Sequence, residues 1–552
     1  MIAGTMHLPG GVPSAHVDPF MRAQLPPPEL WPRFDYSAAH LGRYPDRLNA
    51  SVALLDAAIA AGAGDRPAFH YEGITWTFGH LLDRVQRIAR VLVEDFGLVP
   101  GERVLLRSAN TPMVAACWLA VLRAGGIVIN TMAMLRAREL GFILEKAQVR
   151  FALCEASLAE ELSLAASSLA LPERIACFTA ACDASHPDAD LDRRVAAKPA
   201  SGGAVATAAD DVALVSFTSG TTGHPKGAAA FHRDLLAAAD CWPKVHTVEP
   251  DDVVVGSPSL AFTYGLGASL LYPLRYRATS VLIPSPTPEA LLGAVARHRA
   301  TSLYSVPALY QSMLPLVEAY DLSSMRKCAS AGENLRATLW EQWHAATGLR
   351  AVNGLGTTEM LTHFVSESMR VDCAGSMGRA VPGYTVELLD DAGLPAPRGE
   401  RGRLAVIGPT GCRYIGDPER QRMAVQHGWN LTGDICDRDE DGRFWYVDRA
   451  DDMIVSAGYN ISPQEVERVV AEHPGVAACA VVGVPHETRG HAVRACVVLR
   501  DPHDATDAKA AEIQQYVKSV IAPYKYPREV RFIDELPRTA TGKVQRYRLR
   551  GD

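Results

Sequence analysis

Residues 216–227 read SFTSGTTGHPKG and combine small hydroxyl side chains, glycines and one lysine in a single run. Glycine lets backbone N–H groups approach a ligand closely and tolerates positive φ. Hydroxyl groups donate hydrogen bonds to phosphate oxygens, and Lys226 adds a point charge. The run therefore predicts an anion-binding loop, although composition alone leaves open a flexible Ser/Gly surface loop. It is not a Walker loop, because Pro225 precedes the lysine and Gly227 follows it.

The segments on either side of this run predict how it is held. Residues 212–215 (VALV) predict a buried strand, and a helix is expected from about Ala228 to Cys241, ended by Pro243. A strand, a glycine loop and a helix in this order would turn backbone donors and a helix N-terminus toward phosphate.

Composition limits the classes of function. The chain has 552 residues, 48% of them hydrophobic, which is enough for several domains with large cores. A net charge of −7 argues against nucleic-acid binding, and no uninterrupted apolar stretch approaches the ~18 residues of a membrane span. The N-terminus lacks the features of a signal peptide, and the 11 cysteines include no CxxC pair. We expect a cytoplasmic protein with reduced cysteines.

The order of predicted elements indicates an α/β fold. From Leu54 onward, helix-like and strand-like runs alternate, which predicts a large N-terminal domain of parallel sheets flanked by helices. Between about Gly378 and Tyr446, short apolar runs separated by turns predict a small β-barrel-like region. The last hundred residues predict a small, mobile α+β domain. The expected boundaries are 1–448 for the N-terminal domain, 449–451 for a hinge and 452–552 for the C-terminal domain.

Four further motifs accompany the glycine loop. They are VNGLGTTEM (352–360), LTGD (431–434), WYVDRADDMIVSAGYNIS (445–462) and PRTATGK (537–543). Together, in this order, the five motifs resemble those of the adenylate-forming enzymes, which include acyl- and aryl-CoA synthetases, luciferases and peptide-synthetase adenylation domains. The resemblance covers nearly the whole chain from about residue 50. It implies an acid–thiol ligase that joins a carboxylate to the α-phosphate of ATP and then passes the acyl group to a thiol.

The resemblance also implies roles for individual residues. Glu359 would hold Mg²⁺ as a hard carboxylate ligand, Thr358 would contact the α-phosphate, and Lys543 would neutralise charge in the adenylation transition state. Asp434 would accept both ribose hydroxyls. The full ATP-binding set is Thr218, Ser219, Gly220, Thr221, Thr222, Lys226, Gly332, Glu333, Asn334, Gly354, Leu355, Gly356, Thr357, Asp434 and Arg449.

Asp451 matches the family's hinge residue. In the family the C-terminal domain rotates about this point after adenylation, which withdraws the lysine and brings a glycine loop to the thiol tunnel. Ser456, Gly458 and Tyr459 of that loop are the residues expected at coenzyme A. The expected small molecules are thus a carboxylic acid, ATP, Mg²⁺ and coenzyme A, and a homodimer is left open.

Several stretches resemble the benzoate-type branch and 2-aminobenzoate–CoA ligases in particular, among them AFTYGLGASLLYPL (261–274) and FHRDLL (231–236). The acyl pocket would then be lined by Thr263, Tyr264, Thr362 and His363. Thr362 stands where many benzoate-type ligases carry His, and Leu355 is an aliphatic residue where many relatives place an aromatic. We expect an aromatic acid such as benzoate or 2-aminobenzoate. The alternatives are a medium-chain aliphatic acyl-CoA synthetase and a stand-alone adenylation enzyme that loads a carrier protein.

Overall fold

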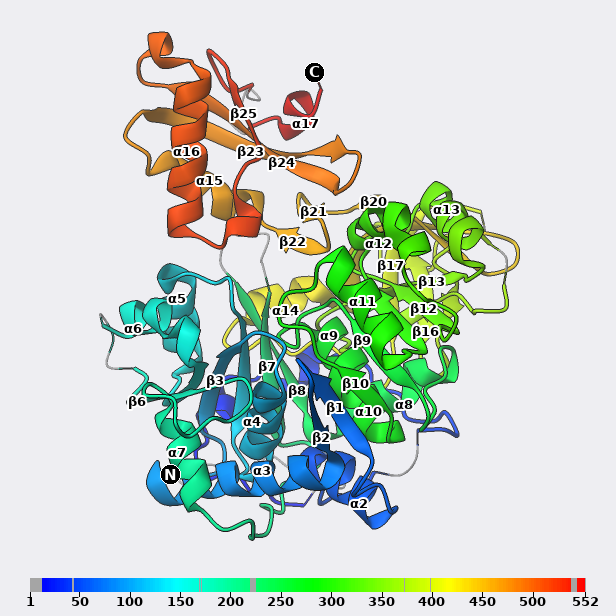
Figure 1. Cartoon of the computed structure of the whole chain (residues 1–552). Coiled ribbons are helices and arrows are strands. Elements are labelled where there is room, and N and C mark those ends of the chain that lie inside the picture. Colours follow the sequence, from blue (N-terminus) through cyan, green and yellow to red (C-terminus); the bar gives the residue numbers. More distant parts are fainter. Residues whose placement is uncertain are drawn as a thin grey trace.

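The structure is a computed structural model of the whole chain, and it describes residues 12–41, 44–167, 169, 171–218, 225–371, 373–397, 399–537 and 544–551. Figure 1 shows a large N-terminal part, blue to yellow, below a smaller C-terminal part, orange to red.

Two large sheets form the frame of the N-terminal part. The nine-stranded sheet runs β15 (Arg379–Ala380), β14 (His363–Ser366), β13 (Ala351–Gly356), β12 (Lys327–Ser330), β11 (Ser302–Ser305), β9 (Val253–Gly256), β10 (Thr279–Val281), β1 (Pro67–Tyr71), β2 (Ile74–Thr77). The six-stranded sheet runs β6 (Arg174–Phe178), β5 (Phe151–Glu155), β3 (Arg103–Ser108), β4 (Ile127–Met132), β7 (Val212–Thr218), β8 (Lys226–Phe231). Both are parallel at their centres and antiparallel only toward the edges.

Helices cover both faces of both sheets. On β3, Val104 and Leu106 belong to one hydrophobic core and Leu105 to another, so successive residues face opposite layers. The core between the sheets contains α3 (Phe78–Arg90), α4 (Pro112–Arg123), α8 (His232–Cys241) and α10 (Tyr272–Tyr276). The outer layers are α5 (Ala137–Ala147) with α6 (Ala159–Ser167), and α11 (Pro288–His298), α12 (Pro307–Met313) with α13 (Ala337–Thr347). The predicted α/β class is confirmed.

The helix predicted from about Ala228 to Cys241 ends as predicted but begins only at His232, so the predicted start is wrong. Residues 226–231 (KGAAAF) form β8, which pairs antiparallel with β7, and α8 begins only at His232. Alanine favours helices, but here the segment is buried between β7 and residues 413–415, and tertiary pairing overrides the local preference. The strands on either side of the glycine loop are therefore an antiparallel pair, and residues 219–224 lie outside the described part of the chain.

A third sheet contains the predicted small β region: β16 (Thr385–Leu389), β17 (Gly402–Ile407), β18 (Val425–Gln426), β19 (Trp429–Arg438) and β20 (Phe444–Arg449). The C-terminal sheet contains β21 (Ile454–Ser456), β22 (Tyr459–Ile461), β23 (Val476–His486), β24 (Gly490–Leu499) and β25 (Glu529–Phe532). It packs with α15 (Pro463–Ala471) and α16 (Asp507–Val520) around a core of its own. The chain passes between these two sheets from Arg449 to Ile454.

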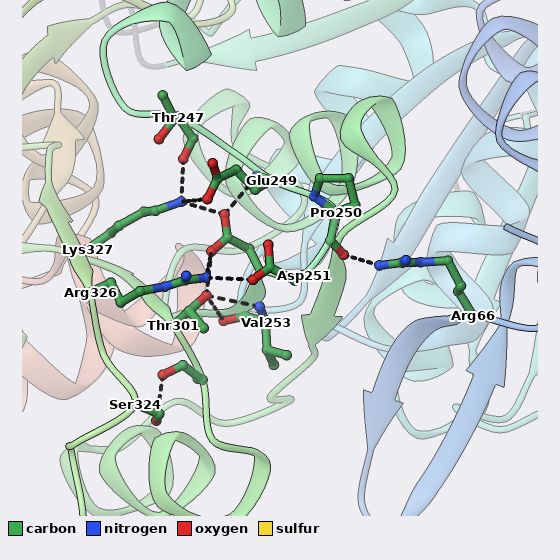
Figure 2. Close-up of polar contacts among 12 residues, drawn as sticks. Arg66, Thr247, Glu249, Pro250, Asp251, Val253, Thr301, Ser324, Arg326 and Lys327 are labelled. Carbon is green, nitrogen blue, oxygen red and sulfur yellow. Dashed lines mark hydrogen bonds and ion pairs between the residues drawn. The ribbon is translucent and has the colours of Figure 1, made fainter. Parts of the chain in front are cut away.

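A buried polar network fixes the amino ends of the central strands of the nine-stranded sheet (Figure 2). Lys327, at the start of β12, donates to Asp252 at 2.5 Å and to the Thr247 carbonyl at 2.8 Å. Asp252 also accepts from the Thr301 hydroxyl at 2.7 Å and from the Arg326 guanidinium at 3.0 Å. The network ties β9, β11 and β12 together at the end opposite to the residues described next. Within the described residues, no helix is long and apolar enough to cross a membrane.

Candidate active site

Two cavities open at the carboxyl ends of the central strands, where parallel α/β sheets bind ligands. We call one the nucleotide cavity, after the predicted ATP-binding residues that line it, and its volume is about 870 Å³. We call the other the acyl cavity, after the predicted pocket residues, and its volume is about 910 Å³. They share Gly332, which follows β12, and Gly356, Thr357 and Thr358, at the end of β13. A molecule in one cavity can thus meet a molecule in the other at this junction.

The nucleotide cavity collects most of the residues predicted for ATP. Those that line it are Thr218, Lys226, Gly332, Glu333, Asn334, Gly354, Leu355, Gly356, Thr357, Asp434 and Arg449. The predicted catalytic residues Thr358 and Glu359 and the predicted hinge residue Asp451 line it as well. The predicted residues Ser219, Gly220, Thr221, Thr222 and Lys543 lie outside the described part of the chain.

Lys226, Tyr414 and Glu359 form a compact polar cluster at one end of the nucleotide cavity. The ammonium of Lys226 lies 2.9 Å from Oε1 of Glu359 and donates to the Tyr414 hydroxyl at 2.5 Å. That hydroxyl donates in turn to Glu359 Oε1 at 2.5 Å. Burial opposes ionisation of Glu359, but the charge of Lys226 and the hydrogen bond from Tyr414 outweigh it and lower the pKa to about 2. An ionised, buried carboxylate therefore stands beside an anion-binding lysine.

Asp434 and Arg449 occupy the opposite side of the nucleotide cavity as cross-strand partners on β19 and β20. The guanidinium of Arg449 donates to Asp434 at 2.8 Å and binds both oxygens of Asp451, at 2.6 and 2.8 Å. Asp451 lies in the segment between β20, which belongs to the third sheet, and β21, which belongs to the C-terminal sheet. Arg449 thus connects the predicted ribose carboxylate to the predicted hinge.

Asn353 holds the loop that carries Gly332, Glu333 and Asn334 of the predicted ATP-binding set. Its amide donates to Asn334 at 3.1 Å and to the Ser376 carbonyl at 3.0 Å. Gly332 in this loop has φ +88°, and a Cβ there would lie 3.3 Å from the Cα of Gly458. Only glycine allows the two backbones to come so close.

The acyl cavity contains all four predicted pocket residues, Thr263, Tyr264, Thr362 and His363. The Tyr264 hydroxyl donates to the Ala329 carbonyl at 3.1 Å, so its ring is fixed across the cavity wall. The buried His363 ring lies 4.5 Å from that of Trp242 and edge-on to Tyr264 at 5.3 Å. Burial lowers the pKa of His363 to about 3, so the ring is neutral.

The turn between β21 and β22, which we call the 456–459 loop, closes one wall of the acyl cavity. Ala457, Gly458 and Tyr459 line the cavity, whereas Ser456 is buried at the base of the loop and lines neither cavity. The Gly458 N–H donates to Glu333 at 2.8 Å. Burial raises the pKa of Glu333 to about 7, even though this hydrogen bond lowers it. The C-terminal domain is thus docked with its glycine loop at the junction of the cavities.

Two arginines stand at the C-terminal side of the acyl cavity. Arg489 and Arg528 both line it. Arg489 is near enough to Glu333 for the two charges to influence each other, and Arg528 donates to the Tyr526 hydroxyl at 2.6 Å. Burial and the positive charge of Arg528 lower the pKa of Arg489. Arg528 lies over one ring, that of Tyr526, at 4.6 Å, and Lys518 lies over the same ring at 4.1 Å. This group of cations stands out in a chain with a net charge of −7.

The sequence motifs did not reveal every residue at the cavities. Tyr414 comes from a segment 188 positions after Lys226 and has no local signal. Tyr272 lines the acyl cavity and shares a hydrogen bond of 2.7 Å with the Thr362 hydroxyl. Its spacing of eight residues from Tyr264 on a helical run places both rings on one face, and this signal was available.

Comparisons with known proteins agree with this geometry. Residues 56–413 match the AMP-binding enzyme family, and residues 465–543 match the AMP-binding enzyme C-terminal domain. A benzoate–CoA ligase of Thauera aromatica is 32% identical over 92% of this chain and 97% of its own length.

Two solved structures are similar to the whole chain. One is an anthranilate CoA ligase, AuaEII, in complex with anthranoyl-AMP, with 29% identity, a TM-score of 0.72 and coverage of 92% of this chain and 97% of that one. The other is the amide bond synthetase McbA from Marinactinospora thermotolerans, with 27% identity, a TM-score of 0.81 and coverage of 91% and 99%.

The fold and the two joined cavities define an adenylate-forming enzyme. The chain belongs to the AMP-binding enzyme family, and the resemblance drawn from its five motifs is confirmed.

Proposed function

We propose that this protein is an ATP-dependent, AMP-forming acid–CoA ligase that acts on an aromatic carboxylic acid. The observation that carries the proposal is the meeting of the nucleotide and acyl cavities at Gly332 and residues 356–358. A carboxylate from one side and an α-phosphate from the other must come together at such a point. The reaction passes through an acyl-adenylate with release of pyrophosphate, and the acyl group then moves to a thiol.

In the first half-reaction, the chain must hold two anions close together. We assign Lys226 and Thr218 to the β- and γ-phosphates, and Thr358 to the α-phosphate. Asp434 accepts from the ribose hydroxyls, and Arg449 donates to this carboxylate and orients it. The PRTATGK motif assigns Lys543 to neutralising the charge that develops as pyrophosphate departs.

The residues present fit a magnesium ion. Mg²⁺ is commonly bound by one or two carboxylates together with substrate phosphates, and Glu359 is a buried, ionised carboxylate in the nucleotide cavity. When bound, Mg²⁺ supplies charge that screens the repulsion between phosphate and carboxylate. Before ATP arrives, Lys226 neutralises Glu359, so neither charge is buried alone.

In the second half-reaction, the acceptor is a phosphorylated thiol, coenzyme A. Arg489 and Arg528 are cations on the C-terminal side of the acyl cavity, and guanidinium groups suit phosphate. A small amine or thiol would offer these arginines no phosphate to bind. This distinguishes the proposal from an amide-forming enzyme.

The acyl cavity favours a flat ring. Tyr264, Tyr272 and neutral His363 present aromatic faces and edges, and such contacts are worth roughly 0.5–1.5 kcal/mol beyond the area they bury. Similarity to a benzoate–CoA ligase and to an anthranilate CoA ligase supports the same class of acid. We rank benzoate and 2-aminobenzoate together.

The test is kcat/KM for acetate, hexanoate, benzoate, 2-aminobenzoate and palmitate with ATP, Mg²⁺ and coenzyme A. An aromatic acid is expected to lead. If hexanoate or palmitate leads by about tenfold, a difference of roughly 1.4 kcal/mol, the enzyme is an aliphatic acyl-CoA synthetase. AMP release without thioester formation on coenzyme A would favour the carrier-protein alternative. Replacing coenzyme A by pantetheine, which lacks the phosphates, is expected to raise KM in the wild type but not in Arg489→Ala/Arg528→Ala.

A further inference from the structure

A lysine is buried between two carboxylates at the contact of the two domains. Lys525, in the short turn Pro523–Lys525, donates to Glu139 of α5 and, at 2.7 Å, to Glu465 of α15. The side chains of Lys525, Glu139 and Glu465 are only 4%, 4% and 9% exposed. Glu139 belongs to the N-terminal domain and the other two residues to the C-terminal domain. We call these three residues the interdomain triad.

Glu139 makes further contacts that need the C-terminal domain in place. Its Oε2 accepts from the Ala522 N–H at 2.9 Å, across the interface, and from the Arg136 N–H of its own helix start at 3.0 Å. The carboxylate in the first turn of α5 is therefore satisfied on one side by its own helix and on the other by the partner domain.

The surroundings of the triad are apolar and close to the 456–459 loop. Ala522 is fully buried and belongs to the hydrophobic core on the outer face of the six-stranded sheet. Tyr524, beside Lys525, stacks on Tyr459 at 4.3 Å, and Tyr459 packs against Phe262 at 5.9 Å. The triad and the aromatic contacts thus hold the same face of the C-terminal domain against the acyl cavity.

The triad has an unequal charge balance, with two carboxylates for one ammonium. Lys525 and Glu465 remain together if the C-terminal domain moves away, but Glu139 then exchanges its partners for water. Conversely, docking without a charged Glu139 leaves the Ala522 N–H and part of the lysine's hydrogen-bonding capacity unsatisfied in a buried place. Breaking one partner out of a buried ion pair is strongly unfavourable, so the triad distinguishes the docked orientation from any other.

We propose that Glu139 and Lys525 are positioning residues for the thioester-forming half-reaction, holding the C-terminal domain in the orientation that places the 456–459 loop at the acyl cavity. The inference rests on the proposed function, in which the domain takes a second orientation for adenylation. Neither residue lines either cavity, so both act through the loop rather than on the substrates.

The experiment separates the two half-reactions in Glu139→Gln. Acid-dependent exchange of pyrophosphate into ATP reports adenylation, and single-turnover consumption of a synthetic aryl-adenylate with coenzyme A reports thioester formation. We expect thioester formation to fall by about tenfold or more, as loss of a buried charge partner implies, and adenylation to stay within about twofold. Lys525→Met, which leaves two carboxylates facing each other, is expected to show the same split.

The matched control is the neighbouring residue. Arg138 forms an interdomain pair with Glu472 at 2.7 Å, but each side chain is 39% exposed. Arg138→Gln is expected to change neither half-reaction by more than about twofold, because exposed pairs contribute little. Thioester formation within twofold of wild type in Glu139→Gln, or a parallel fall of both half-reactions, would overturn the proposal.

A second measurement does not depend on activity. Hydrogen exchange at the Ala522 amide is expected to be faster in Glu139→Gln than in wild type, because glutamine offers one acceptor oxygen where glutamate offers two, and the docked domain is held less firmly. Unchanged protection there overturns the positioning role whatever the enzyme does. A wild-type protein with protected Ala522 that makes no aryl-adenylate would contradict the proposed function alone.

Discussion

At the scale of residues, the site pairs opposite charges that its ligands would later separate. Lys226 neutralises Glu359, and Arg449 is shared by Asp434 and Asp451. Each pairing offsets the cost of holding a charge away from water. Tyr414 connects the first pair as both acceptor and donor.

We predict that Tyr414→Phe weakens binding of the magnesium complex of a non-hydrolysable ATP analogue. The ring remains, but Lys226 and Glu359 lose their common partner, and hydrogen bonds to charged groups are worth about 1.5–3 kcal/mol, or roughly ten- to hundredfold in Kd. Titration calorimetry over a range of Mg²⁺ concentrations measures the effect. Tyr310→Phe, which removes a buried hydroxyl outside both cavities, is the control. Equal affinities for Tyr414→Phe and wild type would show that the hydroxyl does not position the pair.

Glu333 makes docking of the C-terminal domain sensitive to pH. Its pKa is raised to about 7 from an ordinary value of 4.5, chiefly by burial, and the Gly458 N–H beside it comes from the docked loop. A raised pKa means that the docked state holds a proton more tightly. The stabilisation is complete below the ordinary value and is lost as pH rises through about 7.

We therefore predict that protection of the Gly458 amide from hydrogen exchange, corrected for the intrinsic rate, falls as pH rises from about 4.5 to about 7 and changes little above that. In Glu333→Gln, which cannot titrate, the corrected protection is expected to be flat over the same range. A similar decline in both proteins would assign the effect to another group.

At the scale of elements, the two ends of the central strands have different roles. The carboxyl ends of β12 and β13 carry the residues at the junction of the cavities, whereas the amino ends of β9 and β12 carry the Lys327–Asp252 network of Figure 2. The first set faces ligands, and the second fixes the positions of the strands. Substitutions at the two ends should therefore have different consequences.

We predict that Lys327→Met lowers the free energy of unfolding by about 3 kcal/mol, because it leaves the fully buried Asp252 without its main partner. KM values of the folded enzyme are expected to stay near those of wild type. Chemical denaturation and steady-state kinetics measure the two effects. Arg326→Gln is the control, because Arg326 is 46% exposed and binds the same carboxylate. A comparable loss in both variants would contradict the role given to burial.

At the scale of the whole molecule, the structure holds one orientation of two domains. The 456–459 loop is at the acyl cavity, and Val544, at the start of the last described segment, packs in a core of the C-terminal sheet. Glu139, Lys525 and Glu465 are buried only where the domains meet. The proposed reaction needs a second orientation, in which Lys543 serves adenylation.

We predict that Lys543→Ala nearly abolishes adenylation and leaves thioester formation from a supplied aryl-adenylate largely intact. The charge of this lysine matters only where pyrophosphate departs. The result should be the reverse of that for Glu139→Gln, and the two variants measured side by side test both roles. Equal loss of both half-reactions in Lys543→Ala would count against its assignment.

The sequence by itself determined the family, the α/β class and most of the residues that line the nucleotide cavity. Glycine loops and motif residues act through local backbone geometry and side-chain chemistry. A short segment such as VNGLGTTEM determines both of these properties by itself. Alternating helix and strand patterns likewise depend on neighbours along the chain.

Only the tertiary structure decided the contacts between distant segments. KGAAAF became a strand because β7 pairs with it, against the helical preference of alanine. Tyr414 reached Glu359, Arg489 approached Arg528, and Lys525 was buried between Glu139 and Glu465. The physical reason is the same in each case. Burial and electrostatic partnership depend on distances in space, which for residues tens to hundreds of positions apart are fixed only when the sheets and domains have packed.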